Sequence, residues 1–528
     1  MKYDVVICGG GAAGCVLASR LAANPELSVL VLEAGNDYDP AQIPDDVRYG
    51  HTRYAEAQDS IHNWALRGTI TEEQGQIHVA QGKVIGGGSS INGQAMQRGF
   101  PEDYDSWAAL GNDEWSYEKV LPYFRKSERD LDIQDNYCHG NDGPMPVRRR
   151  QTGPTPAIQQ AFHAACTAAG FPTTNDTNGL HPHGLGVSPS NNIDGVRVST
   201  ALSHLSQVRH HLNLTIRGGV HVRKILIEDG KAVGVEAESG GKVFRVAADR
   251  VVLSSGAIRS PQLLMLSGIG PADHLRQFGI PVVLDLPGVG QNLMNHLSAQ
   301  LTFKVKDGIH LAGHDRDVVH FSLHYTADGS DYVNDMVLRT TPVIDDREEK
   351  VPGVRTKYLS GDVSPEQVAR ISCTLGLPDG TGFVRLASAD PGVQPEFNYR
   401  YLQHPNDCRR VRDGVRMAAK LLQSSAYKDV VDFRIHPADD ILASDDALDV
   451  WMRQTIGTAR HVSGTCKMGP DTDPMAVCDQ YGRVRGVQGL WVADASIMPR
   501  VPRSGGAHAT VIMIGERVID WVAAGAPA

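Results

Sequence analysis

The amino-terminal 33 residues constrain the fold more than any other part of the chain. A β-branched apolar run, Lys2 to Cys8, leads directly into Gly9-Gly10-Gly11-Ala12-Ala13-Gly14, and a helix-forming segment, Cys15 to Ala22, follows. A second apolar run, Ser28 to Leu32, ends at the acid Glu33. Strand, Gly-x-Gly-x-x-Gly turn, helix, strand and acid is the order of a dinucleotide-binding βαβ unit.

Each residue type in this motif answers a separate physical demand. Gly9 permits the tight turn after the strand, Gly11 lets the backbone approach a pyrophosphate, and Gly14 lets the helix pack closely on the sheet. The unpaired N–H groups at the helix N-terminus attract phosphates, and Glu33 can accept hydrogen bonds from ribose hydroxyls. The alternative is an ordinary glycine-rich turn, and the strand, helix and acid around the motif argue against it.

Length and charge exclude several classes of protein. A chain of 528 residues is too long for one core, so we expect two domains or a large doubly wound domain with an inserted unit. The net charge of −10 argues against a nucleic-acid or anionic-membrane partner. No run approaches about eighteen apolar residues, so no membrane span is predicted. We interpret the basic runs Arg148 to Arg150 and Arg209 to His211 as solvated turns.

The start of the chain and its cysteines favour a cytoplasmic protein. The sequence opens on a strand rather than on a charged and then apolar leader, so we expect no secretory signal. The eight cysteines show neither a C-x-x-C pair nor metal-ligand spacing. We therefore predict buried, reduced thiols and no metal site.

Further along the chain, glycines and short strands alternate with helical segments. The stretch Gln81 to Gly93 holds five glycines and can bring bare backbone against a planar ligand. Leu212 to Leu253 reads as short alternating strands, with Val243–Val246 and Arg250–Ser254 as separate strands. Helices are predicted over much of Phe100–Asp130, over Thr155–Gly170, from about Ser260 with Pro261 in the first turn, and over Asn406–Ser425.

Four blocks of the sequence together resemble the glucose-methanol-choline (GMC) family of flavin oxidoreductases, and the resemblance runs from end to end. They are Gly9–Gly35, Gly82–Asn92, Gly256–Gly270 and His461–Glu516. A further family-like loop runs from Leu286 to His296, although Asn295 stands where many members have aspartate.

The resemblance implies an α/β fold, in which a Rossmann-type FAD-binding domain carries an inserted substrate domain built on an antiparallel sheet. We assign residues 1–150, 212–298 and 455–528 to a discontinuous FAD-binding domain. Residues 151–211 and 299–454 are assigned to the substrate-binding domain.

The family also implies FAD rather than NAD, bound by residues carried over by position. Those expected at the pyrophosphate, ribose and adenine are Gly9, Gly11, Ala12, Ala13, Gly14, Glu33, Ala34 and the backbone of Val222. Those expected near the flavin are Val84, Gly87, Asn92, Gly93, Ala95, Asp494, Ala495, Ala509 and Thr510. Ile91 occupies the place of the histidine that binds FAD covalently in choline oxidase-like members, so we predict non-covalent FAD.

The carboxyl-terminal block supplies two candidate catalytic residues. His461-Val-Ser-Gly-Thr-Cys-Lys-Met-Gly469 looks like the family block whose first histidine faces the flavin N5. An imidazole can accept a hydroxyl proton at neutral pH, so His461 is the predicted general base. His508 stands where the family places an asparagine or histidine, and it is expected to hold the alkoxide. The helix after it would point its N-terminus at the flavin N1–C2 carbonyl and stabilise an anionic reduced flavin.

The expected reaction is oxidation of a primary alcohol to an aldehyde, with oxygen or a quinone- or dye-type acceptor taking the electrons. Isoleucine at position 91 and histidine at position 508 make choline a poor candidate, and an aromatic or heteroaromatic hydroxymethyl compound is weakly preferred. Two alternatives stay open: a hydroxynitrile lyase-like protein without net redox, and a non-catalytic flavin-binding protein. Arg503 is interpreted first as an exposed loop residue, and contact with an anionic substrate group stays open as the alternative. The sequence does not specify the alcohol, the acceptor or the oligomeric state.

Overall fold

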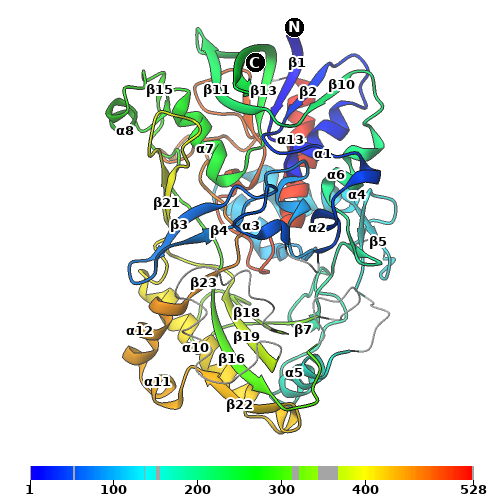
Figure 1. Cartoon of the computed structure of the whole chain (residues 1–528), viewed down its shortest axis with the longest axis vertical. Coiled ribbons are helices and arrows are strands. Elements are labelled where there is room, and N and C mark those ends of the chain that lie inside the picture. Colours follow the sequence, from blue (N-terminus) through cyan, green and yellow to red (C-terminus); the bar gives the residue numbers. More distant parts are fainter. Residues whose placement is uncertain are drawn as a thin grey trace.

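The structure is a computed structural model, and it describes residues 2–50, 54–135, 137–149, 155–311, 320–342 and 367–525. Its strands form two seven-stranded sheets and several smaller ones. One large sheet lies in the upper half of Figure 1 and the other in the lower half. The fold class predicted from the sequence is confirmed.

The helices are α1 Ala12–Leu21, α2 Asp45–Arg48, α3 Pro101–Ala109, α4 Tyr117–Ser127, α5 Ala157–Ala168, α6 Thr200–Ser203, α7 Gly256–Leu266, α8 Ala272–Gln277, α10 Pro405–Leu422, α11 Asp439–Ala443, α12 Asp445–Thr455 and α13 His508–Ala524. The strands are β1 Lys2–Cys8, β2 Val29–Leu32, β3 Leu66–Thr71, β4 Gly75–Val79, β5 Glu128–Asp130, β6 Met145–Val147, β7 Gly184–Val187, β8 Asn192–Ile193, β9 Val196–Arg197, β10 Leu214–Arg217, β11 His221–Glu228, β12 Lys231–Ser239, β13 Lys242–Leu253, β14 Ile269–Gly270, β15 Leu284–Asp285, β16 Leu297–Val305, β17 Phe321–Tyr325, β18 Met336–Pro342, β19 Val368–Leu375, β20 Phe383–Arg385, β21 Glu396–Asn398, β22 Val431–His436, β23 Gly457–Thr458 and β24 Leu490–Val492.

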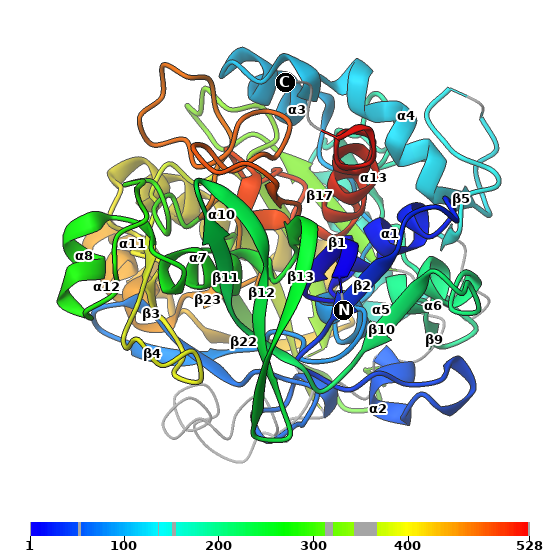
Figure 2. The same cartoon turned by 90° about the horizontal axis from the view of Figure 1, so that it is seen from above.

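The first large sheet has the strand order β10-β2-β1-β13-β12-β11, and β24 pairs with β13. The central strand β1 lies between β2 and β13 and runs parallel to both. Its residues Val5 to Cys8 are fully buried, which is why this stretch is a continuous apolar run. α1 and α13 pack against each other beside this sheet, as Figure 2 shows from above.

The carboxyl ends of the parallel strands meet at one edge of this sheet. β1 is followed by Gly9, β2 by Glu33, β13 by Ser254, and β24 by Ala493 and Asp494. The chain leaves β1 towards β2 on one side, and its other neighbour is β13, so this edge is a topological switch point. Open α/β sheets bind their ligands in the crevice at such a point.

The second large sheet is antiparallel, with the order β22-β16-β19-β18-β17-β7 and β23 beside β16. One face of β16 carries Leu297, Ala299 and Leu301, all at most 1% exposed. The helices α10 and α5 pack on this sheet, and Figure 1 shows them beside it in the lower half of the molecule. The domain division stays a prediction, although the strands of the two large sheets follow it closely. The exceptions are β16, which begins at Leu297, and β23 at 457–458.

Two boundaries predicted from the sequence are wrong. The two strands expected at Val243–Val246 and Arg250–Ser254 form one long strand, because β13 pairs with β12 along its first half and with β1 beyond it. Helix α7 begins at Gly256 rather than near Ser260, so that Pro261 lies inside it. Proline has no N–H to give the carbonyl of Ala257, and the Thr465 hydroxyl donates to that carbonyl instead at 2.5 Å.

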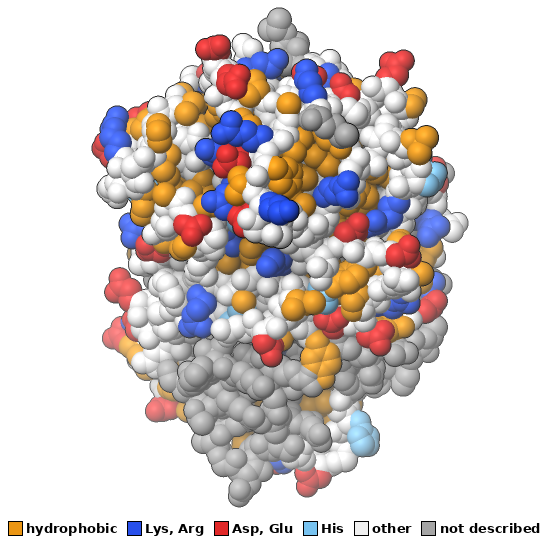
Figure 3. All heavy atoms as spheres, turned by 45° about the horizontal axis from the view of Figure 1, so that its top comes forward, with side chains coloured by type: hydrophobic (Ala, Val, Ile, Leu, Met, Phe, Trp, Pro, Cys, Tyr) orange, Lys and Arg blue, Asp and Glu red, His pale blue; other side chains and the backbone are white. Residues whose placement is uncertain are grey.

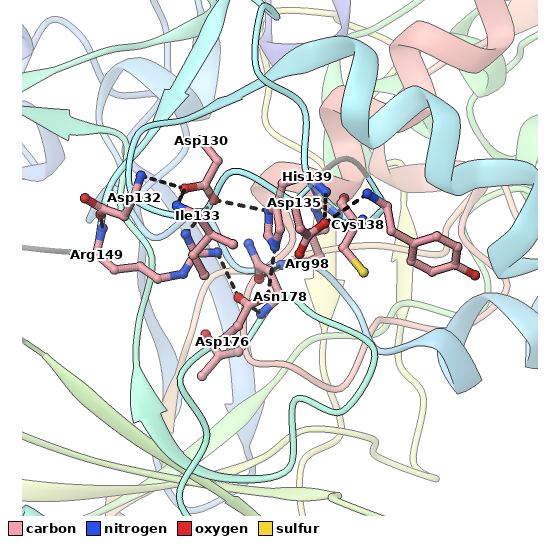
Figure 4. A network of polar contacts seen from close by, with 12 residues as sticks. Arg98, Asp130, Asp132, Ile133, Asp135, Cys138, His139, Arg149, Asp176 and Asn178 are labelled. Carbon is pink, nitrogen blue, oxygen red and sulfur yellow. Dashed lines mark hydrogen bonds and ion pairs between the residues drawn. The ribbon is translucent and has the colours of Figure 1, made fainter.

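A buried ion cluster, formed by Arg98, Glu128, Asp130, His139, Arg149 and Asp176, joins distant segments. Figure 4 labels all of these residues except Glu128. His139 Nδ1 lies 2.8 Å from Glu128, and His139 Nε2 lies 2.8 Å from Asp176. Burial opposes the charge on His139, but its carboxylate partners outweigh burial and raise its pKa to about 11. The three carboxylates therefore face three cations.

Arg149 in this cluster corrects the interpretation of the run 148–150 as a solvated turn. Its side chain is only 5% exposed, because it bridges Asp130 and Asp176. Arg150 lies outside the described residues.

No described helix combines the length and the apolar character that a membrane span requires. On the face shown in Figure 3, basic and acidic side chains are interspersed over the part not drawn in grey.

Candidate active site

A cavity of about 1350 Å³ is lined by residues from both large sheets. Its lining includes the glycine turn after β1, the two candidate histidines and one face of β16, β18 and β19. Pockets for drug-sized ligands measure roughly 300–1,000 Å³. This cavity is therefore large enough for a dinucleotide together with a small second molecule.

The glycine turn at the start of α1 is built for a diphosphate. A Cβ on Gly14 would lie 2.1 Å from the Gly9 carbonyl oxygen, so only glycine lets the helix approach the turn this closely. α1 begins at Ala12, and no side chain caps its N-terminus. Its first N–H groups are therefore available to an anion.

Glu33 holds the turns on both sides of this site. Its carboxylate accepts from the N–H of Gly10 at 2.9 Å and from the N–H of Gly35 at 2.8 Å. Burial raises the pKa of Glu33 to about 7, although these hydrogen bonds oppose the shift. The carboxylate oxygens keep lone pairs that can accept from ribose hydroxyls.

The second glycine-rich segment lies directly against the first turn. Gly86 donates its N–H to the Gly10 carbonyl at 2.7 Å. Gly87 has φ +52°, and a Cβ there would lie 2.7 Å from the Cα of Gly11. A Cβ on Gly88, by contrast, would meet nothing within 4 Å, because Gly88 faces the cavity.

Asp494 follows β24 and lies across the switch point from Glu33, which follows β2. One carboxylate oxygen accepts from the Gly256 N–H at 2.9 Å and the Ser260 hydroxyl at 2.6 Å, which fixes the start of α7. The other accepts from the N–H and hydroxyl of Ser496. Burial raises the pKa of Asp494, and these hydrogen bonds oppose the shift.

His461 is held in a defined tautomer by His296. The Nε2 of His296 must donate to the Pro502 carbonyl, 2.9 Å away, so its Nδ1 is an acceptor when the ring is neutral. That Nδ1 lies 2.9 Å from Nδ1 of His461, which must then donate. His461 therefore keeps its Nε2 as an acceptor, as a general base requires.

The backbone of His461 is fixed as well. Its N–H donates to Asn295 Oδ1 at 2.7 Å, and Asn295 Nδ2 donates to the Thr458 hydroxyl at 2.6 Å. Asparagine can donate and accept in this way, so its presence in place of the usual family aspartate is compatible with a positioned base.

His508 has the complementary tautomer. Asn92 Oδ1 accepts from the Gln94 N–H, which turns Asn92 Nδ2 towards Nδ1 of His508 at 3.3 Å. His508 Nδ1 is then an acceptor and Nε2 carries the proton. This buried Nε2 has no hydrogen-bond partner among the described residues. The cavity is thus lined by one histidine that can accept a proton and by a second, His508, whose protonated Nε2 is buried and has no described partner.

Both histidines are neutral at ordinary pH. Burial, and then the nearby His296, Arg339 and Arg460, hold the pKa of His461 well below its usual value. Burial also lowers the pKa of His508 to about 4. His508 is the first residue of α13, whose N-terminus no side chain caps.

Most of the residues predicted from the sequence line this one cavity. They are Gly9, Gly11, Ala12, Ala13, Glu33, Ala34, Gly87, Asn92, Gly93, Ala95, Val222, His461, Asp494, Ala495 and His508. Gly14, Val84, Ala509 and Thr510 do not line it. Gly14 faces the Gly9 carbonyl, Val84 lies in a small apolar cluster, and Thr510 bonds the Tyr104 hydroxyl at 2.8 Å. Their assignment to the cofactor stays a prediction.

The interpretation of Arg503 as an exposed loop residue is wrong. Its side chain is 8% exposed and donates to Asp103 at 2.7 Å and to the Val333 carbonyl at 2.7 Å. Asp103 accepts from the Phe100 N–H at the start of α3, so the pair joins the loop before α13 to α3. Arg503 does not line the cavity.

Several cavity residues had no sequence signal. Arg259 lies over the ring of Trp64 at 4.0 Å, and His221 lies beside Trp64. Arg339 and Arg370 come from β18 and β19. Arg339 and Arg370 reach the cavity only because strands that are far apart in the sequence pair with one another.

The site fits FAD on observations independent of any resemblance. Two helix N-termini, of α1 and α13, have no side-chain cap, and Gly88 leaves open space beside the first turn. The buried Nε2–H of His508 has no described partner. These features suit an anionic, planar dinucleotide.

Comparison with known proteins agrees with this class. Residues 3–298 match the family model of the GMC oxidoreductase N-terminal domain, and residues 378–515 match that of the C-terminal domain. The chain therefore belongs to the GMC oxidoreductase family, the FAD-dependent oxidoreductases that act on CH–OH donors.

Individual relatives cover nearly the whole chain. An oxygen-dependent choline dehydrogenase of Photobacterium profundum is 36% identical over 99% of this chain and 94% of that protein. An uncharacterized GMC-type oxidoreductase of Rhodococcus erythropolis is 34% identical over 97% of each. Among solved structures, pyridoxine 4-oxidase from Mesorbium loti superposes with a TM-score of 0.88 at 27% identity, over 98% of each chain. A formate oxidase has a TM-score of 0.87 at 25% identity, covering 99% of this chain and 98% of that one.

Proposed function

We propose that the protein oxidises a primary alcohol to an aldehyde, with His461 as general base and His508 holding the alkoxide. The observation that carries this proposal is the complementary pair of neutral histidines in one cavity. His461 Nε2 accepts the hydroxyl proton, and His508 Nε2–H donates a hydrogen bond to the oxygen that becomes negatively charged. When bound, FAD supplies the hydride acceptor.

FAD binding is proposed to be non-covalent. The N-terminus of α1, Glu33 and the glycines of both turns would hold the diphosphate and ribose, and the N-terminus of α13 would face the flavin together with His508. Ile91 lines the cavity where choline oxidase-like relatives carry the linking histidine, and its side chain can form no such bond. FAD should therefore leave the protein intact on acid precipitation. The electron acceptor, oxygen or a quinone-type molecule, stays open.

We propose a cytoplasmic location for the protein. A cytoplasmic protein is supported by its eight cysteines, all of them buried and free. The proposed partners are a small alcohol and a redox acceptor.

Choline is the substrate named for several relatives, but the cavity does not favour it. A quaternary ammonium is recognised by aromatic rings or by carboxylates. The acids that line the cavity are Glu33, Glu56, Glu73 and Asp494. Glu33 and Asp494 hold the glycine turn and α7, and Glu56 and Glu73 form ion pairs with Arg460 and Arg453.

The proposal is tested by replacing the base. His461→Ala should retain FAD and lose alcohol turnover by about 10²- to 10⁴-fold in kcat. The control is Cys466→Ser, in the same sequence block but not in the cavity lining, which should keep kcat near the wild-type value. Unchanged turnover in His461→Ala would refute the assignment of the base.

The lyase alternative predicts a different result. A hydroxynitrile lyase-like protein would cleave a cyanohydrin without reducing its flavin. Turnover of a cyanohydrin, together with a flavin that no alcohol reduces, would favour it over the oxidation proposed above.

A further inference from the structure

One face of the antiparallel sheet is polar where it borders the cavity. In the ladders, Gln300 on β16 lies opposite Ser372 on β19, which lies opposite Arg339 on β18. Side chains directly opposite in a ladder point to the same face. We call this set the polar face: Ser298, Gln300, Thr302, Arg339, Thr341, Arg370, Ser372 and Thr374, all of which line the cavity.

Hydrogen bonds tie the centre of the polar face together. The Ser372 hydroxyl donates to Gln300 Oε1 at 2.7 Å, Gln300 Nε2 donates to Ser298 at 3.0 Å, and the Thr374 hydroxyl donates to Ser298 at 2.9 Å. None of its members is aromatic. This surface suits a hydrogen-bonding substrate better than the aromatic alcohol expected from the sequence.

Arg339 brings a positive charge to this face without a carboxylate partner among the described residues. Its guanidinium donates to Gln97 Oε1 at 3.0 Å and to the carbonyls of Ser504 and Gly505 at 3.2 and 3.4 Å. Its Nε has no described acceptor. Burial lowers the pKa of Arg339 to about 10, and no acid opposes the shift. Charges withdrawn from water are normally paired in proteins, so this half-buried arginine lacks a counter-ion among the described residues.

Arg339 is connected to both candidate catalytic histidines. Ser504 and Gly505, whose carbonyls it binds, lie in the loop that leads to His508 at the start of α13. Its charge also lowers the pKa of His461 and of His296. An anion bound by Arg339 would therefore lie at the same end of the cavity as the proposed base.

We propose that the substrate is a hydroxy acid: a primary alcohol that carries a carboxylate, which pairs with Arg339 on the polar face. This inference rests on the proposed function and specifies its substrate class. The carboxylate neutralises the half-buried guanidinium, and the hydrogen-bonding side chains around it accommodate the chain that joins the carboxylate to the alcohol. The same charge disfavours choline, because a cation would face Arg339.

The test compares acids with their neutral amides in the FAD-loaded protein. The probes are 3-hydroxypropanoate and 4-hydroxybutanoate, the primary amide of each, and choline. For at least one pair, the acid should exceed its amide in kcat/KM by about thirtyfold or more, because the amide leaves the half-buried charge of Arg339 unpaired. Equal turnover of acid and amide in both pairs, or a preference for choline, would overturn the proposal.

Two variants of Arg339 test whether this residue causes the preference for the acid over its amide. Arg339→Gln should bring acid and amide within about threefold of each other, mainly by raising the KM of the acid, and Arg339→Lys should retain part of the preference. The matched control is Arg385→Gln, an exposed arginine on β20 paired with Glu396, which should behave as wild type. A preference that survives in Arg339→Gln would contradict the assignment. If Arg339→Gln does not fold, the ratio of kcat/KM between acid and amide, measured in Arg339→Lys and in wild type, still tests the proposal.

A binding experiment separates this inference from the redox proposal. Butanoate, which has no hydroxyl to oxidise, is titrated against the flavin absorption spectrum of wild type and Arg339→Gln. A spectral shift in wild type that the variant loses supports the anion site, even if no alcohol reduces the flavin. If butanoate causes no shift while neutral alcohols are oxidised, the anion site is wrong and the proposed function stands.

Discussion

At the scale of single residues, the proposed chemistry depends on which nitrogen of each histidine carries the proton. His296 fixes this for His461 through the two Nδ1 atoms, and Asn92 fixes it for His508. His296 is a positioning residue in this account, because it acts through His461. His296 and His461 are 165 positions apart in the sequence, so no local pattern could reveal the pair.

Replacement of His296 tests whether this residue fixes the tautomer of His461. His296→Leu removes the acceptor for the His461 Nδ1–H, so the His461 ring can present the wrong nitrogen. We expect kcat to fall by about tenfold or more with FAD content unchanged, and His296→Asn, which can offer an oxygen at the Nδ1 position, to recover part of the loss. Steady-state kinetics with matched FAD content measure both. Wild-type kcat in His296→Leu would argue against this role.

The pH profile tests the protonation state of the base. A general base works only when neutral, and the pKa of His461 lies well below its usual value of 6.5, first because of burial and then because of His296 and Arg339. Activity should therefore be lost only as pH falls through that lowered pKa. In a profile of kcat/KM against pH, the acid limb should have its midpoint below pH 6.5. A midpoint at or above this usual value would show that His461 is not desolvated as described.

At the scale of elements, the buried ion cluster connects β5 to the segments that carry Arg98, His139, Arg149 and Asp176. We expect His139→Gln to lower the free energy of unfolding by about 3–5 kcal/mol, because it leaves buried carboxylates without their central cation. Urea unfolding of the FAD-loaded protein measures it. The control, Arg276→Gln at an ion pair whose arginine side chain is 65% exposed, should cost less than about 1 kcal/mol.

The stabilisation by His139 should also depend on pH. Its folded-state pKa, about 11, lies above the unfolded value of 6.5, so its contribution is fully present below pH 6.5 and is lost as pH rises towards 11. The difference in unfolding free energy between wild type and His139→Gln should therefore shrink from about pH 6 to about pH 10. A difference that stays constant would mean that His139 is not charged in the cluster.

The residues expected to bind the dinucleotide could be predicted from local motifs. The residues of the polar face could not, because they come together only through the pairing of strands that are distant in the sequence. Gly9 to Gly14 and Glu33 lie within one βαβ unit, whose geometry follows from the sequence itself. The alternation of Ser298, Gln300 and Thr302 is visible in the sequence too, but a polar strand face normally indicates solvent. Only the pairing of β16, β19 and β18 turns that face towards a cavity and adds Arg339 to it.

At the scale of the whole molecule, the two large sheets each supply one half of the cavity. The parallel sheet contributes the carboxyl ends of β1, β2, β13 and β24, which suit a dinucleotide. The antiparallel sheet contributes the polar face, which suits the substrate. The helix α13 packs against α1 and begins at His508, so it links the nucleotide end of the cavity to the reacting end.

An alcohol bound in this cavity is proposed to reduce the flavin, and anaerobic visible spectroscopy detects that reaction. Primary alcohols, including the hydroxy acids, are added without oxygen to the purified FAD-loaded protein, and the oxidised flavin band is followed. We predict that the band bleaches with at least one alcohol and that it bleaches at least about a hundredfold more slowly in His461→Ala with the same FAD content. A flavin that no alcohol bleaches, or one that bleaches equally in His461→Ala, would contradict the account.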